Sequence, residues 1–202
     1  MTSEIAFDKE AHAYYVDGRR VPSVTQILRE WILINGYYVN VLDGTMIHRS
    51  KMERSREYGS AFHEALKLYV ENDLDEDSLH PDLRAAFEQF KLWYASNDVE
   101  PIAIEKPIFN RQLMYAGTPD LVAKVRGRPA VIEYKTGSHL MAGPQTAAYA
   151  NALSHQIYRR YVLYFPRHGY MRQIELDSSD DFQFFRARLI EFNYLKRKGI
   201  IK

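Results

Sequence analysis

GTPDLVAKVRGRPAVIEYK, at residues 117–135, predicts two short strands joined by a tight turn. An apolar, β-branched run at 121–125 is followed by a turn that contains a Gly and a Pro, and a second apolar run covers 130–135. Side chains alternate between the two faces of a strand, so we expect Glu133 and Lys135 to share one face. An acid and an amine therefore stand together at the end of an apolar strand.

A third charged residue, Asp120, precedes the first strand, and a hairpin can bring it beside Glu133. Two hard carboxylate ligands suit Mg²⁺ or Mn²⁺, and Lys135 beside them can hold an attacking water or offset charge on a phosphate. The alternative is an exposed hairpin with a weak surface ion pair. The apolar Val131 and Ile132 before the charges favour the first interpretation, because charges at the end of a buried strand are costly.

The composition is that of a globular chain with a substantial core. With 202 residues, 46% of them hydrophobic, the chain is expected to form a single domain over 1–202. We expect a hairpin and helices over 1–100, and the sheet with its flanking helices over 101–202. Cysteine is absent, which excludes disulfides, cysteine zinc sites, thiol nucleophiles and cysteine-ligated iron–sulfur clusters.

Charge and hydropathy limit the partners. The net charge is +1 at pH 7, so contact with nucleic acid must use local basic patches. The N-terminus, MTSEIAFDKE, is polar and acidic, unlike a signal peptide. No apolar run reaches the roughly 18 residues that a membrane helix needs. These features predict a cytoplasmic protein that is not secreted and has no membrane partner.

The N-terminal region combines a predicted hairpin at 5–21 with a helix that begins after Ser23. Ser23 as N-cap and Gln26 three residues later form a capping box. Apolar residues follow at helical spacing: Val24, Ile27, Leu28 and Trp31. Ser23 and Thr25 serve capping alone in the simpler interpretation, and in the other they belong to a helix N-terminus that binds a phosphate.

Residues 35–58 are predicted to be irregular and then basic. The basic residues are His48, Arg49, Lys51, Arg54 and Arg56. On a helix they would form a solvated face by default, and the alternative is a cationic wall for a nucleic-acid backbone.

Two amphipathic helices are expected next, one from Gly59 and one over 78–96. His63 lies at the edge of the apolar stripe of the first helix. A lone histidine there is usually structural, although it could also reach a site beneath the helix.

The C-terminal half continues the sheet. Residues 101–109 predict a strand, in which Glu105 points either to the site or to solvent. A helix from Pro144 to about Tyr158 carries Gln145 and Tyr149 on one face. Two further strands, at 158–165 and 170–176, precede a last helix that is capped by Ser179 or Asp180. This order predicts an α/β fold with a mixed sheet flanked by helices.

Four separated segments resemble motifs of the PD-(D/E)XK nuclease superfamily, in the order of its RecB-type exonuclease branch. They are GSAFHE at 59–64, GTPDL at 117–121, IEYKTG at 132–137, and Gln145 with Tyr149 as a Q-x-x-x-Y helix. VPSVTQIL at 21–28 is similar to a segment of phage exonucleases and of the mitochondrial genome maintenance exonuclease. The resemblance covers residues 14–165.

The resemblance implies a restriction-endonuclease-like core with an N-terminal helical arch, and it implies a role for each matching residue. His63, Asp120 and Glu133, with the backbone carbonyl of Tyr134, would bind one or two Mg²⁺ or Mn²⁺ ions, and Lys135 would orient the hydrolytic water. Gln145 and Tyr149 would position DNA and the Lys135 strand, and Glu105 would be an outer acid of the site. No iron–sulfur cluster is expected.

The resulting hypothesis is a metal-dependent deoxyribonuclease that degrades single strands or free DNA ends in phage or bacterial recombination, replication or repair, in association with the nucleoid. The residues expected to contact DNA are Ser23, Thr25, Arg49, Lys51 and Arg54, with Tyr37, Tyr38 and Tyr58 stacking on bases. A non-cleaving nucleic-acid-binding module and a site- or structure-specific endonuclease are the alternatives. The oligomeric state stays open.

Overall fold

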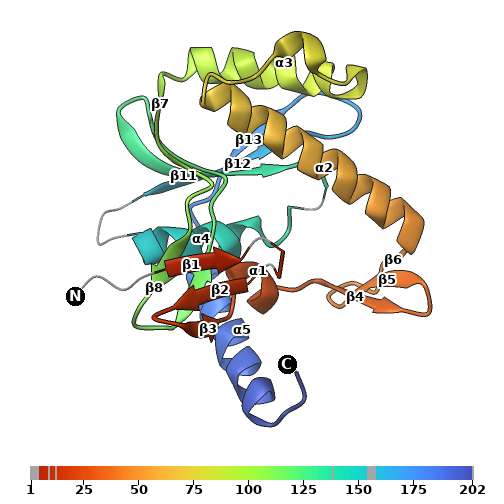
Figure 1. The fold of residues 1–202 in the computed structure, drawn as a ribbon, viewed down its shortest axis with the longest axis vertical. Helices are drawn as coiled ribbons and strands as arrows, with labels where there is room; N and C mark the ends of the chain where they lie inside the picture. The colour runs from red at the N-terminus through yellow and green to blue at the C-terminus, as the bar shows by residue number, and fades with distance from the viewer. Residues whose placement is uncertain (1–4, 9, 12, 138, 154–157, 202) are drawn as a thin grey trace.

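The computed structural model describes residues 5–8, 10–11, 13–137, 139–153 and 158–201 (Figure 1). A five-stranded sheet lies at its centre. Its strands in spatial order are β13 (Arg172–Glu175), β12 (Arg159–Tyr164), β11 (Arg128–Lys135), β10 (Leu121–Val125) and β7 (Val99–Ile104). β11 and β12 run parallel and the other neighbours run antiparallel. The predicted mixed sheet is confirmed.

The β10–β11 hairpin forms as its sequence predicts. Leu121 pairs with Ile132 at one end of the ladder, and Val125 pairs with Arg128 at the other. The turn residue Arg126 has φ 51° and the following glycine has φ 72°, the conformation that tight two-residue hairpin turns require. The second strand begins at Arg128, earlier than the expected residue 130.

Helices cover both faces of this sheet (Figure 1). The helices on one face are α2 (Arg49–Val70) and α3 (Pro81–Ser96), which follows the short 3₁₀ helix at Glu76–Ser78. The helices on the other face are α1 (Val24–Ile27), α4 (Ala142–Leu153) and α5 (Asp180–Arg197). Ile132 and Tyr134 pack in the first core and Val131 packs in the second. The alternation of β11 therefore turns Glu133 and Lys135 toward α4.

Three smaller sheets complete the fold. Their strands are β1 (Ile5–Asp8), β2 (Ala13–Val16) and β3 (Arg19–Val21); β4 (Trp31–Ile34), β5 (Tyr37–Asn40) and β6 (Met46–His48); and β8 (Ile108–Asn110) with β9 (Tyr115–Gly117). The hairpin expected over 5–21 is the first of these sheets, with a third strand added.

The N-terminal half departs from the expectation in two places. The helix after Ser23 is a single turn, and Trp31 begins strand β4 instead of continuing the helix. The aromatic and β-branched run Trp31–Ile34 favours a strand once it has a partner, and β5 supplies that partner. Residues 35–58 are expected from the sequence to be irregular at first, with the basic residues considered on a helix; the first part is a β-meander, and α2 then carries the basic residues from Arg49 onward. The predicted N-terminal helical arch is not confirmed.

Gly59 lies inside α2 rather than at its beginning, because the helix starts at Arg49. A Cβ at this position would lie 3.2 Å from the side-chain oxygen of Thr136. The glycine thus allows α2 to approach the segment that follows Lys135. One helical turn later, His63 is carried to the same end of β11.

The remaining elements follow their predicted order with shifted ends. Residues 101–109 divide into β7 and β8, with Glu105 between them at φ 42°. α4 begins at Ala142, and its predicted end lies partly in 154–157, outside the described residues. Ser179 is the N-cap of α5, but its side chain makes no capping hydrogen bond. Across the described part of the chain, no helix has the length and apolar character that a bilayer crossing requires.

Candidate active site

A pocket of about 640 Å³ lies where β10, β11 and α4 meet. Asp120, Glu133 and Lys135 line it, together with Gln145 and Tyr149 from α4. Asp120 stands just before β10, Glu133 and Lys135 stand two residues apart on β11, and the two α4 residues are one helical turn apart. The hairpin and the helix after it therefore bring residues from three separate segments to one place.

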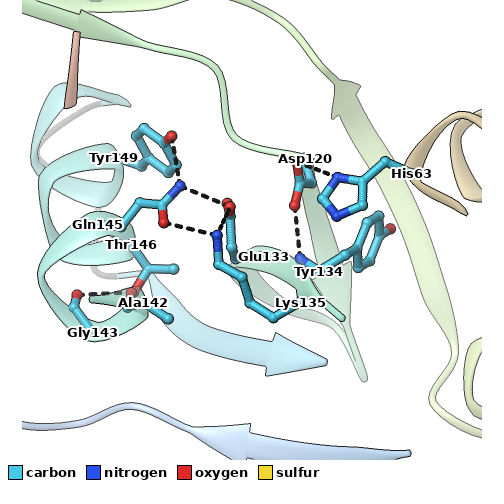
Figure 2. A network of polar contacts seen from close by, with 10 residues as sticks. All are labelled: His63, Asp120, Glu133, Tyr134, Lys135, Ala142, Gly143, Gln145, Thr146 and Tyr149. Carbon is cyan, nitrogen blue, oxygen red and sulfur yellow. Dashed lines mark hydrogen bonds and ion pairs between the residues drawn. The ribbon is translucent and has the colours of Figure 1, made fainter. Parts of the chain in front are cut away.

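Glu133, Lys135 and Gln145 form a closed hydrogen-bonded triangle (Figure 2). The Lys135 ammonium donates to Glu133 Oε1 at 2.8 Å and to Gln145 Oε1 at 3.0 Å. The Gln145 amide donates to Glu133 Oε1 at 2.7 Å and to the Tyr149 hydroxyl at 3.1 Å. Glu133, Gln145 and Tyr149 are all buried. The ammonium is thus held in one position by two fixed acceptors.

Asp120 belongs to a second set of contacts beside the first (Figure 2). Its Oδ2 accepts a hydrogen bond from the backbone N–H of Tyr134 at 2.7 Å. Its Oδ1 lies 3.3 Å from Nδ1 of His63, which reaches it from α2. The His63 ring meets the Tyr134 ring edge-on, with ring centroids 5.8 Å apart. Asp120 therefore ties the start of β10 to the end of β11 and to α2.

The two carboxyl groups differ in their affinity for a proton. Burial, and then the negative charge of Asp120, raise the pKa of Glu133 to about 7. Burial also acts to raise the pKa of Asp120, but the charges of His63 and Lys135 and the Tyr134 N–H outweigh it, so its pKa falls below the ordinary value. One acid of the pair is thus ionised at neutral pH while the other sits near its titration point.

The pKa values of the two basic groups, Lys135 and His63, are shifted toward the charged form for the complementary reason. Burial acts to lower the pKa of Lys135, but the negative charges of Glu133 and Asp120 outweigh it and raise the pKa above its usual value. Burial likewise acts against His63, and the charge and hydrogen bond of Asp120 raise its pKa. Lys135 therefore carries its positive charge in the pocket at neutral pH.

One carboxylate oxygen of the Glu133–Lys135–Gln145 triangle has no partner within the described residues. Glu133 Oε2 is buried and makes no hydrogen bond within the described residues, although an unpaired buried carboxylate oxygen is costly. A divalent cation would satisfy it, and carboxylate and imidazole ligands suit such an ion. No three of the described His, Asp and Glu side chains are grouped so that they could hold a metal ion, because His63 and Asp120 face each other while Glu133 Oε1 faces Lys135. The metal-binding role of these residues stays a prediction.

Three further predicted residues lie near the pocket. Ser23 forms its capping box with Gln26, and its hydroxyl lies 3.1 Å from that of Thr25. Thr25 itself lines the pocket. Glu105 also lines it, and its backbone N–H donates to the Asp120 carbonyl at 3.1 Å. Of the two orientations open for Glu105, its side chain takes the one toward the site.

The predicted basic residues on α2 lie elsewhere. Arg49, Lys51 and Arg54 are exposed, and Arg49 pairs with Glu53 at 2.6 Å. None of the three lines this pocket. Their contact with DNA remains a prediction.

The three predicted stacking tyrosines are dispersed. Tyr37 stands edge-on to the ring of His48, Tyr38 lies under the guanidinium of Arg56, and Tyr58 stacks on Phe62. Tyr58 thus packs against the core beneath α2. Base stacking by these residues also remains a prediction.

Two ionisable residues near the site were not expected from the sequence. Lys67 lines the pocket, with its ammonium 3.7 Å from Glu105 Oε2. Its position four residues after His63, on the same helix face, is the signal that could have indicated it. Glu30 precedes strand β4 and interacts electrostatically with Lys135, and no sequence pattern points to it because the meander brings it there.

Comparison with known proteins gives one family. A model described as the PD-(D/E)XK nuclease superfamily matches residues 83–189, which include Asp120, Glu133, Lys135 and Gln145 but not His63. No curated protein matches the chain. A solved structure titled "Crystal structure of SSO0001" is similar over 68% of this chain and 68% of that chain, with 17% identity and a TM-score of 0.35.

Proposed function

Because the chain belongs to the PD-(D/E)XK nuclease superfamily, we propose that it is a Mg²⁺- or Mn²⁺-dependent DNA exonuclease of the RecB-type branch. It acts on single strands or free DNA ends, in recombination, replication or repair in a phage or bacterial setting. The observation that carries the proposal is the unpartnered, buried Glu133 Oε2 beside the fixed ammonium of Lys135. A divalent cation would satisfy this carboxylate oxygen, and the phosphate of a substrate would pair with the neighbouring ammonium.

Each residue of the pocket has a distinct task in this proposal. Asp120 and Glu133, with His63 and the Tyr134 carbonyl, would hold the ion, and the chemistry that it would supply is a polarised phosphoryl oxygen and a lower pKa of water. Lys135 keeps its proton, so its ammonium orients the attacking water and offsets charge on the phosphate.

The α4 residues fix this arrangement. Gln145 accepts from Lys135 and donates to Glu133, so it sets the direction in which the ammonium points. Tyr149 in turn accepts from the Gln145 amide. Water adds to phosphorus and releases one proton, the bond from phosphorus to the leaving sugar oxygen breaks, and that oxygen takes up a proton, so the net change is hydrolysis.

Replacement of Lys135 tests the assignment. We expect Lys135→Ala to lower the rate on a labelled linear single strand with Mn²⁺ by about 100-fold or more, with the fold retained but the melting temperature lowered, because buried Glu133 and Gln145 lose their shared donor. Lys124→Ala is the matched control, because Lys124 is an exposed lysine on β10 that pairs with Glu100 at 3.1 Å. Equal cleavage by the two variants would show that Lys135 is not catalytic.

A second experiment, with a pair of substrates, tests whether cleavage needs the end of a strand. A circular single strand and a linear strand of the same sequence are incubated with wild-type protein and Mn²⁺, with a chelator control. We expect the linear strand to be degraded and the circle to stay intact, because an exonuclease needs an end. Cleavage of the circle would identify an endonuclease, and binding without cleavage of either would identify a non-cleaving module.

A further inference from the structure

A second pocket, of about 520 Å³, adjoins the candidate active site. Thr25, Lys135 and Gln145 line both pockets, so the same three side chains form their common wall. The second pocket opens toward the meander β4–β5–β6, which lies beside the N-terminal end of α2 (Figure 1). The two pockets therefore meet at Lys135.

The meander presents an apolar, aromatic face to this second pocket. Leu33 pairs with Tyr38 across β4 and β5, and Trp31 lies two residues before Leu33, so the pleat places all three on one face. All three line the pocket, and Leu33 is 44% exposed. A flat face of this kind beside a charged site offers contact area to a planar ring.

Cationic groups stand at the same face. The guanidinium of Arg56 lies 4.5 Å from the Tyr38 ring centroid and donates to the Tyr38 hydroxyl at 3.0 Å. Arg29 donates to the backbone carbonyl of Trp31 at 2.8 Å. Within the described residues these acceptors are uncharged, so both arginines keep their positive charge for another partner.

One carboxylate lines the pocket against three cationic side chains, Arg29, Arg56 and Lys135. That carboxylate, Glu30, lies close to the Asn40 side chain and the Met141 backbone, and its buried Oε2 has no hydrogen-bond partner within the described residues. It also interacts with the charge of Lys135. The lining as a whole is therefore cationic and apolar, which complements a phosphate joined to a base.

We propose that this second pocket binds one unpaired nucleotide, next to the phosphate whose charge Lys135 offsets. Its base lies against Trp31, Leu33 and Tyr38, and its phosphate is held by Arg56 and Arg29. The proposal rests on the proposed nuclease function and defines its substrate as a strand that is single at this point. The faces of a paired base are covered by its neighbours in the stack, whereas an unpaired base can stack on aromatic rings and guanidinium planes.

Binding in the presence of a chelator tests the pocket independently of cleavage. The fluorescence anisotropy of a labelled 12-nucleotide strand and of the blunt duplex of the same sequence, about one helical turn, is measured with Arg56→Ala, Tyr38→Ala and Arg84→Ala. Arg84 is the matched control, because it is an exposed helix arginine on α3 that contacts the Asp77 carbonyl and does not line the pocket.

We expect Arg56→Ala and Tyr38→Ala each to weaken single-strand binding about tenfold, and Arg84→Ala to bind like wild type. The slope of log affinity against log salt should become shallower by about 0.7 in Arg56→Ala, because one phosphate contact is lost. In cleavage, the two pocket variants should raise KM and leave kcat nearly unchanged.

Two outcomes would overturn the proposal: pocket variants that bind single strands like Arg84→Ala, or equal losses on the single strand and the duplex. Failure of wild-type protein to cleave any strand with Mn²⁺ would instead overturn the proposed nuclease function. The anisotropy measurement would in that case still decide whether the pocket binds an unpaired nucleotide.

Discussion

The two carboxylate oxygens of Glu133 lie in different environments in the metal-free protein, one hydrogen-bonded and one without a partner among the described residues. Its Oε1 accepts from both Lys135 and Gln145, while its Oε2 is buried without a partner. The protonated acid is therefore favoured in the metal-free protein, and its pKa is raised to about 7. The same environment makes the ionised form available for a cation at slightly alkaline pH.

This raised pKa predicts how stability depends on pH in the metal-free protein. The pKa of Glu133 rises from 4.5 when unfolded to about 7 when folded, so its contribution is complete below 4.5 and is lost as pH rises through 7. His63, with a raised pKa, acts in the same direction. At about 1.4 kcal/mol per pKa unit, we expect the free energy of unfolding to fall by about 3 kcal/mol between pH 5 and pH 8.

Chemical denaturation in a chelating buffer at a series of pH values measures this fall. The variant Glu133→Gln, which cannot ionise, should show a much flatter curve. Glu57→Gln, which alters an exposed glutamate on α2, should follow wild type. If the free energy of unfolding of Glu133→Gln still depended on pH as in wild type, the titration of Glu133 would not be the cause of the fall.

At the scale of elements, one glycine sets how closely three elements meet. A Cβ on Gly117, at the end of β9, would lie 2.4 Å from Cε1 of Tyr149 on α4 and 3.2 Å from Cγ2 of Val24 on α1. Tyr149 is 2% exposed and cannot move away without disturbing the core. The G-x-x-D segment of the sequence thus has a packing reason for its glycine, apart from any catalytic one.

We expect Gly117→Ala to destabilise the protein by about 1–3 kcal/mol, because overpacking forces Tyr149 to shift. Cleavage should fall as well, since Tyr149 holds Gln145 through its hydroxyl. Thermal unfolding and single-strand cleavage measure the two effects. Gly137→Ala is the control, because a Cβ there meets nothing within 4 Å, and an equal effect in both variants would contradict the packing argument.

The elements also show what the sequence can and cannot predict. The β10–β11 hairpin was predictable, because two apolar, β-branched runs flank a glycine turn there, although Pro129 lies in β11 and not in the turn. The meander was missed, because short apolar runs such as Trp31–Ile34 do not separate helix from strand. The start of α2 was missed because Gly59 looks like a helix boundary, whereas it allows a close approach to Thr136.

For the site, local patterns predicted that Asp120, Glu133 and Lys135 lie together, and the structure brings them to one pocket; strand alternation fixes the shared face of Glu133 and Lys135. Local patterns could not identify Glu30, which reaches the site only through tertiary packing, whereas the four-residue spacing from His63 could have indicated Lys67. The unpartnered oxygen of Glu133 also depends on long-range contacts, since Gln145 occupies its other oxygen.

At the scale of the whole molecule, the site depends on one crossover. β11 and β12 run parallel, and α4 connects them across one face of the sheet. That path places Gln145 and Tyr149 over the end of β11, while α2 brings His63 to the opposite face. The site residues are thus attached to elements of both hydrophobic cores. Binding of a cation at the site should therefore raise the free energy of unfolding of the whole protein.

Adding Mn²⁺ should therefore stabilise the protein, and more at pH 8 than at pH 6. The ion and a proton compete for Glu133, whose pKa is about 7, so the ion gains affinity as the proton leaves. At a concentration one hundred times the Kd, stabilisation should be about 2.7 kcal/mol, which raises the Tm by roughly 5–10 °C in a chain of this size. This pH trend runs opposite to that of the metal-free protein.

Thermal unfolding with Mn²⁺ and with chelator at both pH values measures the effect. Glu133→Gln should lose most of the shift, because a neutral amide no longer offers the ion a charged ligand. Glu100→Gln, which alters an exposed acid on β7 that pairs with Lys124, should keep it. A shift that survives in the Glu133 variant, or one that is larger at pH 6, would show that the stabilising ion binds elsewhere, because only binding at Glu133 links metal affinity to this proton.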